Sequence, residues 1–203
     1  MTPSTKQRIA IDVRPLSRPR SGIRRYLESV LVHLLEKSET EWLLYSDAPF
    51  HSEILEHYSI PVRIAGKGRC SRLMWHWQVY RWLQIDKPDV YWTPRHHLPL
   101  WMPKSIRKVV TTHDLVWLTH PGTMQFSGRW AEKILTGRSL KQAQAILAVS
   151  QATADDIQKY YPDASDKITV IRHGWSELRV PLPPLGWEKY VDVTFFLSVG
   201  TIE

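Results

Sequence analysis

Short apolar runs alternate along this chain with longer segments in which apolar residues recur at helical spacing. The runs are five or six residues long and bounded by polar residues, glycine or proline, as buried strands are. They lie at 9–13, 42–46, 60–65, 88–93, 107–112, 145–149 and 167–171. Strands that alternate with helices predict a parallel sheet with right-handed crossovers, which is a doubly wound α/β fold.

The helical patterns lie between these strands. They predict helices at 23–35, 52–57, 69–87, 126–143 and 150–161. The segment 69–87 carries two apolar stripes, one with Leu73, Met74, Trp77 and Tyr80 and one with Trp75, Val79 and Trp82. A helix that is apolar on two faces is either packed between protein elements or laid against an apolar surface such as a membrane. Packing in the core is the commoner reason for two apolar stripes on one helix, and contact with a membrane is the alternative.

The end of the chain differs from the rest in composition. Residues 176–191 contain three prolines and no helical period, as a linker would. An apolar run at 194–199 then restarts a strand pattern. We therefore predict one domain over 1–175, a linker over 176–193, and the first strand of a second, truncated domain over 194–203.

Bulk composition narrows the class of protein. The chain has 203 residues, 43% apolar and 23% charged, and no apolar run near the ~20 residues that cross a bilayer. The apolar run at 9–13 is too short for a secretory signal. Its single cysteine, Cys70, excludes an intramolecular disulfide and a cysteine zinc cluster, and suits a reducing compartment. We expect a cytoplasmic protein.

The net charge of +7 indicates anionic partners. Nucleic acid, phosphate-bearing substrates and an anionic membrane surface all fit this charge. No recognised nucleic-acid motif is present, so we expect no nucleic-acid partner. Contact with the inner face of the cytoplasmic membrane remains an alternative, because a basic cluster precedes the tryptophan-rich helix. The cluster consists of Arg63, Lys67, Arg69 and Arg72.

The stretch KVVTTHDL, residues 108–115, places candidate chemistry at the end of a predicted strand. The strand ends on His113 and Asp114. In an open α/β sheet, ligands bind outside the carboxyl ends of the strands, so His113 can reach a substrate there. A pKa near neutrality would also suit acid–base work. Hydrogen bonds that merely cap the strand end are the structural alternative.

Two other motifs point to binding. Gly22 opens a helix after an arginine-rich loop, where backbone N–H groups and the helix dipole can receive a phosphate. It stands alone, without a dinucleotide fingerprint or a Walker A pattern, and a turn beside solvated arginines would also explain it. The neighbouring His96 and His97 suggest a metal only if further ligands converge, and no H-x-x-x-H or HExxH spacing is present. We expect neither a cofactor nor a metal.

Five segments together resemble the N-terminal half of a family 4 retaining glycosyltransferase of the two-domain GT-B fold, closest to bacterial mannosyltransferase-like members. They are DVRPLSRPRSGIRRYL at 12–27, KVVTTHDL at 108–115, AILAVSQATADDI at 145–157, KITVIRHGW at 167–175 and FFLSVGTIE at 195–203. The resemblance implies a Rossmann-like domain that binds mainly a saccharide or lipid-linked acceptor. A second domain would bind the nucleotide-sugar donor.

The resemblance also implies roles for single residues. Gly22 would approach the donor phosphates, and His113 would contact the donor sugar. The other residues expected at the cleft are Asp114, Ser150, Thr153, His173 and Gly174, with His173 standing where many relatives have asparagine. From charge and position we add, as contacts to the acceptor or to an anionic group, Arg20, Arg24, Arg25, His96 and His97.

The resemblance stops at the first strand of the second half. In the family, the basic residues that hold the donor phosphates and a pair of glutamates lie beyond that point. Stabilising a departing nucleoside diphosphate needs positive groups placed on the diphosphate. We therefore expect little or no transferase activity from these 203 residues alone. A non-catalytic module that binds anionic ligands or docks to a membrane is the alternative function.

Overall fold

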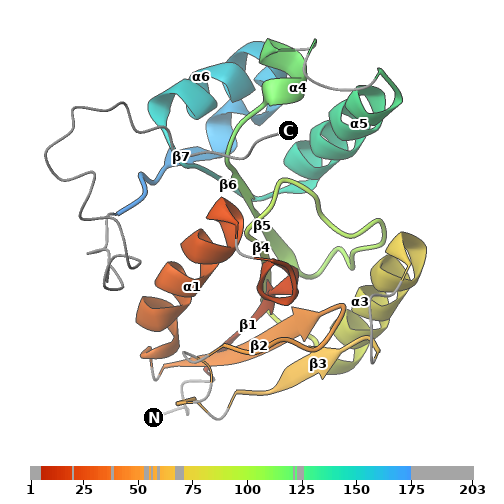
Figure 1. Cartoon of the computed structure of the whole chain (residues 1–203), viewed down its shortest axis with the longest axis vertical. Coiled ribbons are helices and arrows are strands. Elements are labelled where there is room, and N and C mark those ends of the chain that lie inside the picture. The colour runs from red at the N-terminus through yellow and green to blue at the C-terminus, as the bar shows by residue number, and fades with distance from the viewer. Residues whose placement is uncertain are drawn as a thin grey trace, which may run out of the picture. The chain divides into compact units, whose positions relative to one another are not determined.

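The computed structural model contains one seven-stranded parallel sheet (Figure 1). The structure describes residues 6–19, 21–37, 39–52, 55, 57–58, 60–66, 71–120, 122 and 126–174. The strands are β1 (Gln7–Asp12), β2 (Thr40–Ser46), β3 (Val62–Ile64), β4 (Val90–Thr93), β5 (Arg107–Thr112), β6 (Ala145–Ala148) and β7 (Ile168–Val170). All seven strands predicted up to residue 171 are confirmed, and so is their parallel arrangement.

The strand order β3-β2-β1-β4-β5-β6-β7 sets where ligands bind. The chain moves outward from β1 through β2 to β3, then returns to the other side of β1 and moves outward again from β4 to β7. The order therefore reverses between β1 and β4. In open α/β sheets such a switch point leaves a crevice at the carboxyl ends of the two strands.

Helices cover both faces of the sheet. They are α1 (Gly22–Leu35), α3 (Arg72–Asp86), α4 (Val116–Thr119), α5 (Phe126–Gln142) and α6 (Gln151–Tyr160). Two short 3-10 helices lie at Arg14–Ser17 and Pro162–Lys167. Helix α4 is absent from the sequence prediction because four residues are too few to show a period. Of the predicted helix at 52–57, residues 53, 54 and 56 lie outside the described residues, and Leu55 is helical.

Alternate residues of each strand enter different cores because successive side chains point to opposite faces. In β1, Ala10 packs with Trp75 of α3, whereas Ile11 packs with Leu27 of α1. Trp92 of β4 likewise belongs to the α1 core. Figure 1 shows α1 on one side of the sheet and α3 and α5 on the other.

The two apolar stripes of α3 have different environments. Trp75, Val79 and Trp82 are buried in the core. The other stripe stays exposed: Leu73 by 66%, Met74 and Trp77 by 49% each, and Tyr80 by 38%. Core packing thus accounts for one stripe only. None of the helices in the described part of the chain is long and apolar enough to cross a membrane.

The chain divides into two compact units, Met1–His173 and Gly174–Glu203. Every strand and helix reported above belongs to the first unit. Within the second unit only Gly174 is described. The predicted linker at 176–193 and strand at 194–203 therefore lie outside the described residues and stay predictions.

Candidate functional site at the carboxyl edge of the sheet

His113 lies directly after β5, at the carboxyl edge of the sheet. Its Nε2 is 3.0 Å from the carbonyl oxygen of Pro94. A carbonyl oxygen only accepts, so Nε2 carries the proton and Nδ1 is left as an acceptor. Burial lowers the pKa of His113, against an opposing effect of the Pro94 carbonyl, and the nearby His173 lowers it further. The ring is therefore neutral near pH 7, with a lone pair on Nδ1.

Two aromatic rings surround His113. The ring of Tyr26, from α1, lies edge-on to His113 with centroids 5.1 Å apart. Tyr26 also stacks on His173 at 4.8 Å and an interplanar angle of 23°, and His173 meets His113 at 5.7 Å. Residues from α1, from the end of β5 and from the end of β7 thus form one cluster. Tyr26 was not among the predicted site residues, although its place in the first turns of α1, four residues after Gly22, was a usable signal.

Ser150 and Thr153 hold the backbone that carries His113. Ser150 caps α6, because its Oγ accepts a hydrogen bond from the Thr153 N–H at 3.0 Å. The two hydroxyls lie 2.9 Å apart, and Thr153 Oγ1 donates to the carbonyl oxygen of His113 at 3.0 Å. The structural explanation of Ser150 is confirmed. Together the two residues tie the start of α6 to the end of β5.

Gly22 is the first residue of α1, after the capping Ser21. Within the described part of the chain, a Cβ placed on Gly22 would meet no atom within 4 Å. Gly22 is not among the residues whose φ lies in the left-handed region. Neither strain nor crowding in the chain thus calls for glycine here. Among the described residues, the space that a side chain at position 22 would occupy is therefore open.

The arginines expected at the acceptor differ in what holds them. Arg24 donates to Glu28 at 2.9 Å and to three backbone carbonyls, those of Leu16 and Arg18 at 2.9 Å and His51 at 3.2 Å. These bonds use four of its five N–H groups, so Arg24 mainly fixes the loop before α1. Arg25 lies exposed on α1, and Arg20 is outside the described residues.

Asp12 ends β1 at the switch point and is fully buried. It accepts hydrogen bonds from the Arg14 backbone N–H at 3.1 Å, from Nε at 2.9 Å and from Nη2 at 2.7 Å. The Thr93 hydroxyl donates to the same carboxylate at 3.4 Å. Burial favours a higher pKa for Asp12, but Arg14 outweighs it, so the pKa lies below its ordinary value. Arg14 also lies over the ring of Trp75, 4.4 Å from its centroid.

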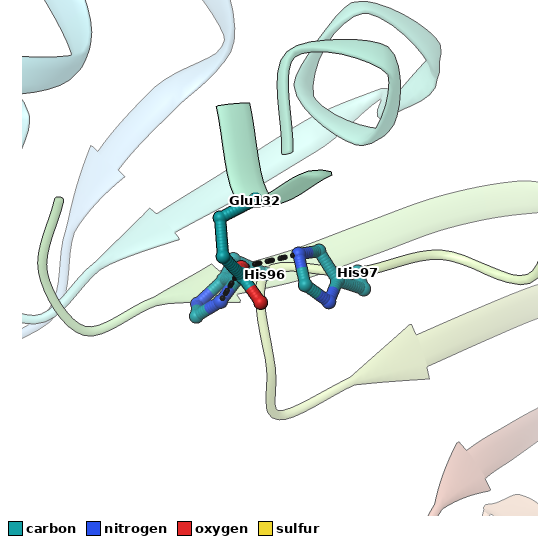
Figure 2. Close-up of side chains that lie close together, drawn as sticks. All are labelled: His96, His97 and Glu132. Atoms are coloured by element: carbon teal, nitrogen blue, oxygen red, sulfur yellow. Dashed lines mark hydrogen bonds and ion pairs between the residues drawn. The ribbon is translucent and has the colours of Figure 1, made fainter. Parts of the chain in front are cut away.

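His96 and His97, in the loop after β4, both contact Glu132 of α5 (Figure 2). Their Nε2 atoms lie 3.2 and 2.8 Å from the same carboxylate oxygen. The three donor atoms fall within 4.8 Å of one another. Imidazole nitrogen and carboxylate oxygen are zinc ligands, so this group offers a donor set for a metal ion. Glu132 was not among the predicted site residues because no short spacing links it to the histidines, and the expected absence of a metal stays a prediction.

The protonation of this cluster follows from its contacts. Burial lowers the pKa of His97, although Glu132 opposes that effect. Burial alone would raise the pKa of Glu132, but hydrogen bonds from the two imidazoles hold it well below its ordinary value. His97 Nε2 also lies 3.3 Å from the Thr136 hydroxyl. The cluster therefore pairs a carboxylate with imidazole N–H groups and joins the loop after β4 to α5.

The remaining predicted site residues lie at the surface. Asp114 is exposed and accepts a hydrogen bond at 3.3 Å from the N–H of Val116, the first residue of α4. His173 follows β7 and keeps an exposed side besides its stack on Tyr26. Gly174 is exposed in the second unit. The structure thus brings together His113, His173, Ser150 and Thr153, and it groups His96 with His97 separately.

Solved glycosyltransferases share this fold. Anabaena Alr3699/HepE in complex with UDP and glucose matches with a TM-score of 0.52 and 16% identity, over 83% of this chain and 45% of that one. A glycosyltransferase from Rickettsia africae ESF-5 matches with a TM-score of 0.52 and 15% identity, over 83% and 43%. The chain thus spans less than half the length of these structures. Its domain has the Rossmann-like architecture of the N-terminal domains of GT-B glycosyltransferases.

The family follows from the sequence match. The model of Glycosyltransferase Family 4 matches residues 20–176, which is most of the chain. The chain therefore belongs to Glycosyltransferase Family 4. No curated protein matches it.

Proposed function

We propose that this domain is the acceptor-binding half of a glycosyltransferase that uses a nucleotide-sugar donor, and that His113 positions the transferred sugar. The observation that carries the proposal is the fixed, neutral imidazole at the carboxyl edge of the sheet. With Nε2–H bound to the Pro94 carbonyl, Nδ1 accepts a hydrogen bond from a sugar hydroxyl. A low pKa makes His113 a weak base near pH 7 and suits this positioning role better than proton abstraction.

The start of α1 is the proposed place for the donor phosphates. The open space at the Cβ position of Gly22 supports an approach of an anion to the start of the helix, at the positive end of its dipole. The first turn of α1 contains no acidic residue that would repel an anion. UDP and UDP-glucose are bound in solved structures of Anabaena Alr3699/HepE, which supports a nucleotide-sugar donor.

The sugar and the stereochemistry are further parts of the proposal. The sequence resemblance favours mannose, transfer with retention of configuration, and a saccharide or lipid-linked acceptor in polysaccharide biosynthesis. Positive groups for the departing diphosphate would come from a donor-binding domain. We therefore propose that the 203-residue chain alone transfers little or no sugar from GDP-mannose or UDP-glucose. Measurable transfer by the purified chain would contradict this part.

Histidine side-chain NMR of the purified chain tests the role of His113. At pH 7 we expect the ¹⁵N shifts of a neutral ring with the proton on Nε2. Adding methyl α-mannoside, or GDP-mannose in a second arm, should shift Nδ1 of His113 and leave the exposed His120 unchanged. A protonated ring, or an Nδ1 that responds to neither sugar, would argue against sugar positioning.

Membrane docking is a second candidate function, because one stripe of α3 is exposed and continues to Trp101, which is 48% exposed. Trp77, Tyr80 and Trp101 line a pocket of about 520 Å³ on this surface. Such aromatic side chains suit the interface of a membrane. Of the basic residues first considered for docking, Arg63 is paired with Asp86.

Vesicle sedimentation tests this candidate. Wild type should bind vesicles with anionic lipids more than neutral ones, less so at high salt, and Trp77→Ala with Trp101→Ala should release it. The matched control is Trp130→Ala, which removes an exposed tryptophan from α5. Equal sedimentation of wild type with and without vesicles would exclude docking.

A further inference from the structure

Arg95 occupies the switch point of the sheet. It is the second residue after β4, and its backbone N–H donates to the Thr93 hydroxyl at 3.3 Å. That hydroxyl in turn donates to Asp12 at the end of β1. Arg95 therefore starts between the carboxyl ends of the two strands where the strand order reverses, which is where open α/β sheets bind their ligands.

The guanidinium group of Arg95 has no hydrogen bond or ion pair with any residue that the structure describes. Its side chain is nevertheless partly buried. Burial, and after it the positive charge of Arg14, hold the pKa of Arg95 below its ordinary value. An arginine stays protonated in such surroundings, so a desolvated positive charge remains at this edge.

The carboxylates near Arg95 or near its neighbour Arg14 are each held by a partner other than Arg95. Asp12 is bound by two nitrogens of the Arg14 guanidinium. Asp47 pairs with Arg18 and accepts a hydrogen bond from Ser17 at 2.9 Å.

Glu132 is also bound by residues other than Arg95. The imidazoles of both His96 and His97 contact its Oε2 (Figure 2). Asp12 and Glu132 attract Arg95 at a distance, but Arg14 and Arg18 oppose that attraction. Among the described residues, no carboxylate at the switch point is thus bound directly to the Arg95 guanidinium.

We propose that Arg95 binds an oxyanion group, a phosphate or a carboxylate, on the acceptor of the sugar transfer. The identification of the ligand as an acceptor rests on the proposed function, whereas the anion site itself does not. A guanidinium presents two parallel N–H groups that match the oxygens of either group. An acceptor with such a group would give the Arg95 guanidinium the partner that it lacks among the described residues. Binding there would also bring the reactive hydroxyl of the acceptor to the edge of the sheet that carries His113.

Anion titration of the purified 203-residue chain tests the site without any transfer reaction. Inorganic phosphate and pyrophosphate represent a phosphorylated acceptor, glucuronate represents a uronic acid, and glucose is the neutral control. Amide NMR shifts should move in a saturable manner around Thr93 and Arg95 with phosphate, glucuronate or both, and not with glucose. The anion that binds more tightly shows whether the charged group of the acceptor is a phosphate or a carboxylate.

Arg95→Gln should weaken the binding of the effective anion by at least about tenfold, because a charge-assisted pair of hydrogen bonds is lost. Arg107→Gln is the matched control, since it removes the same charge from the exposed amino end of β5 and should bind as wild type does. Arg95→Lys keeps the charge but lacks the two parallel N–H groups of a guanidinium, so its affinity for the anion should fall between those of wild type and Arg95→Gln.

Thermal unfolding separates binding from a structural role. Because Arg95 has no partner in the described chain, Arg95→Gln should keep the melting temperature of wild type or raise it. A clear loss of melting temperature in Arg95→Gln would overturn the proposal, and so would equal anion affinity in wild type and Arg95→Gln, or no response of wild type to any anion. If His113 shows no response to sugars but Arg95 binds anions, the site stands and only its assignment to an acceptor fails.

Discussion

Two groups of charged side chains on the same sheet differ in how their charges are paired. In the group around Asp86, at the end of α3, the Asp86 carboxylate is fully paired. Arg63 donates to Asp86 through Nε at 2.6 Å and through a second nitrogen, and the Tyr45 hydroxyl donates to it at 2.7 Å. Arg8 binds the backbone carbonyl of Asp86 at 2.6 Å.

At the carboxyl edge the pairing is incomplete. Asp12 and Arg14 form a buried pair, but Arg95 has no partner among the described residues, and Nδ1 of His113 has no hydrogen bond there. The Thr112 hydroxyl, beside His113, is buried and also lacks a partner among them. Buried polar groups are normally satisfied, and exceptions call for an explanation. A ligand bound at the edge would give Arg95 and His113 their partners, whereas the side chains around Asp86 already have theirs.

Breaking the buried pair of the carboxyl edge should have the largest effect on stability. In Asp12→Ala, Arg14 would keep its charge with its side chain only 13% exposed, so we expect a loss of about 3–5 kcal/mol in the free energy of unfolding. Urea unfolding measures it. Asp12→Asn combined with Arg14→Met should recover most of the loss, and a loss below about 1 kcal/mol in Asp12→Ala would show that the pair is not desolvated.

Removing the charge of Asp86 should lower the free energy of unfolding by less. Asp86→Asn weakens the bonds from Arg63 and Tyr45, but Arg63 is 38% exposed and water can replace the aspartate. We expect a loss of about 1–2 kcal/mol by urea unfolding, and no change in the response of His113 to sugars. If Asp86→Asn abolished that response, the separation between a structural group and a binding edge would fail.

Ser150 connects stability to the site and should have the smallest effect. Ser150→Ala removes the N-cap of α6, which costs about 1 kcal/mol, whereas Ser150→Gly should cost only a few tenths of that. Because Thr153 would then hold the carbonyl of His113 less firmly, sugar-induced shifts of His113 should also shrink. Circular dichroism melts and histidine NMR measure the two effects, and equal stability of both variants would contradict capping.

Periodicity predicted the sheet because burial leaves a direct mark on the sequence. The run at 145–149, and Val109 and Val110 within 107–112, are apolar since these strands are covered by protein on both faces. The positions of His113 and Ser150 followed from the ends of those runs, whereas Thr153 was expected from the family resemblance. The end of a strand is a local feature, so a pattern along the chain can locate it.

Contacts between distant segments left no such mark. Glu132 meets His96 and His97 only because α5 packs over the loop after β4, and Tyr26 meets His173 only because α1 and the end of β7 reach the same edge. The charge of Arg24 suggested a ligand, yet its N–H groups are used by backbone carbonyls. Which charged residues are paired depends on the fold, and a count of arginines cannot supply it.

Sugar transfer by a longer polypeptide that carries both this domain and a donor-binding half tests the central claim most directly. His113→Ala is compared with wild type and with His120→Ala, a change at an exposed histidine. We predict at least a roughly tenfold loss of turnover for His113→Ala, because a hydrogen bond to the sugar is removed. Unchanged turnover and donor affinity in His113→Ala would contradict the account and leave His113 as a structural cap of β5.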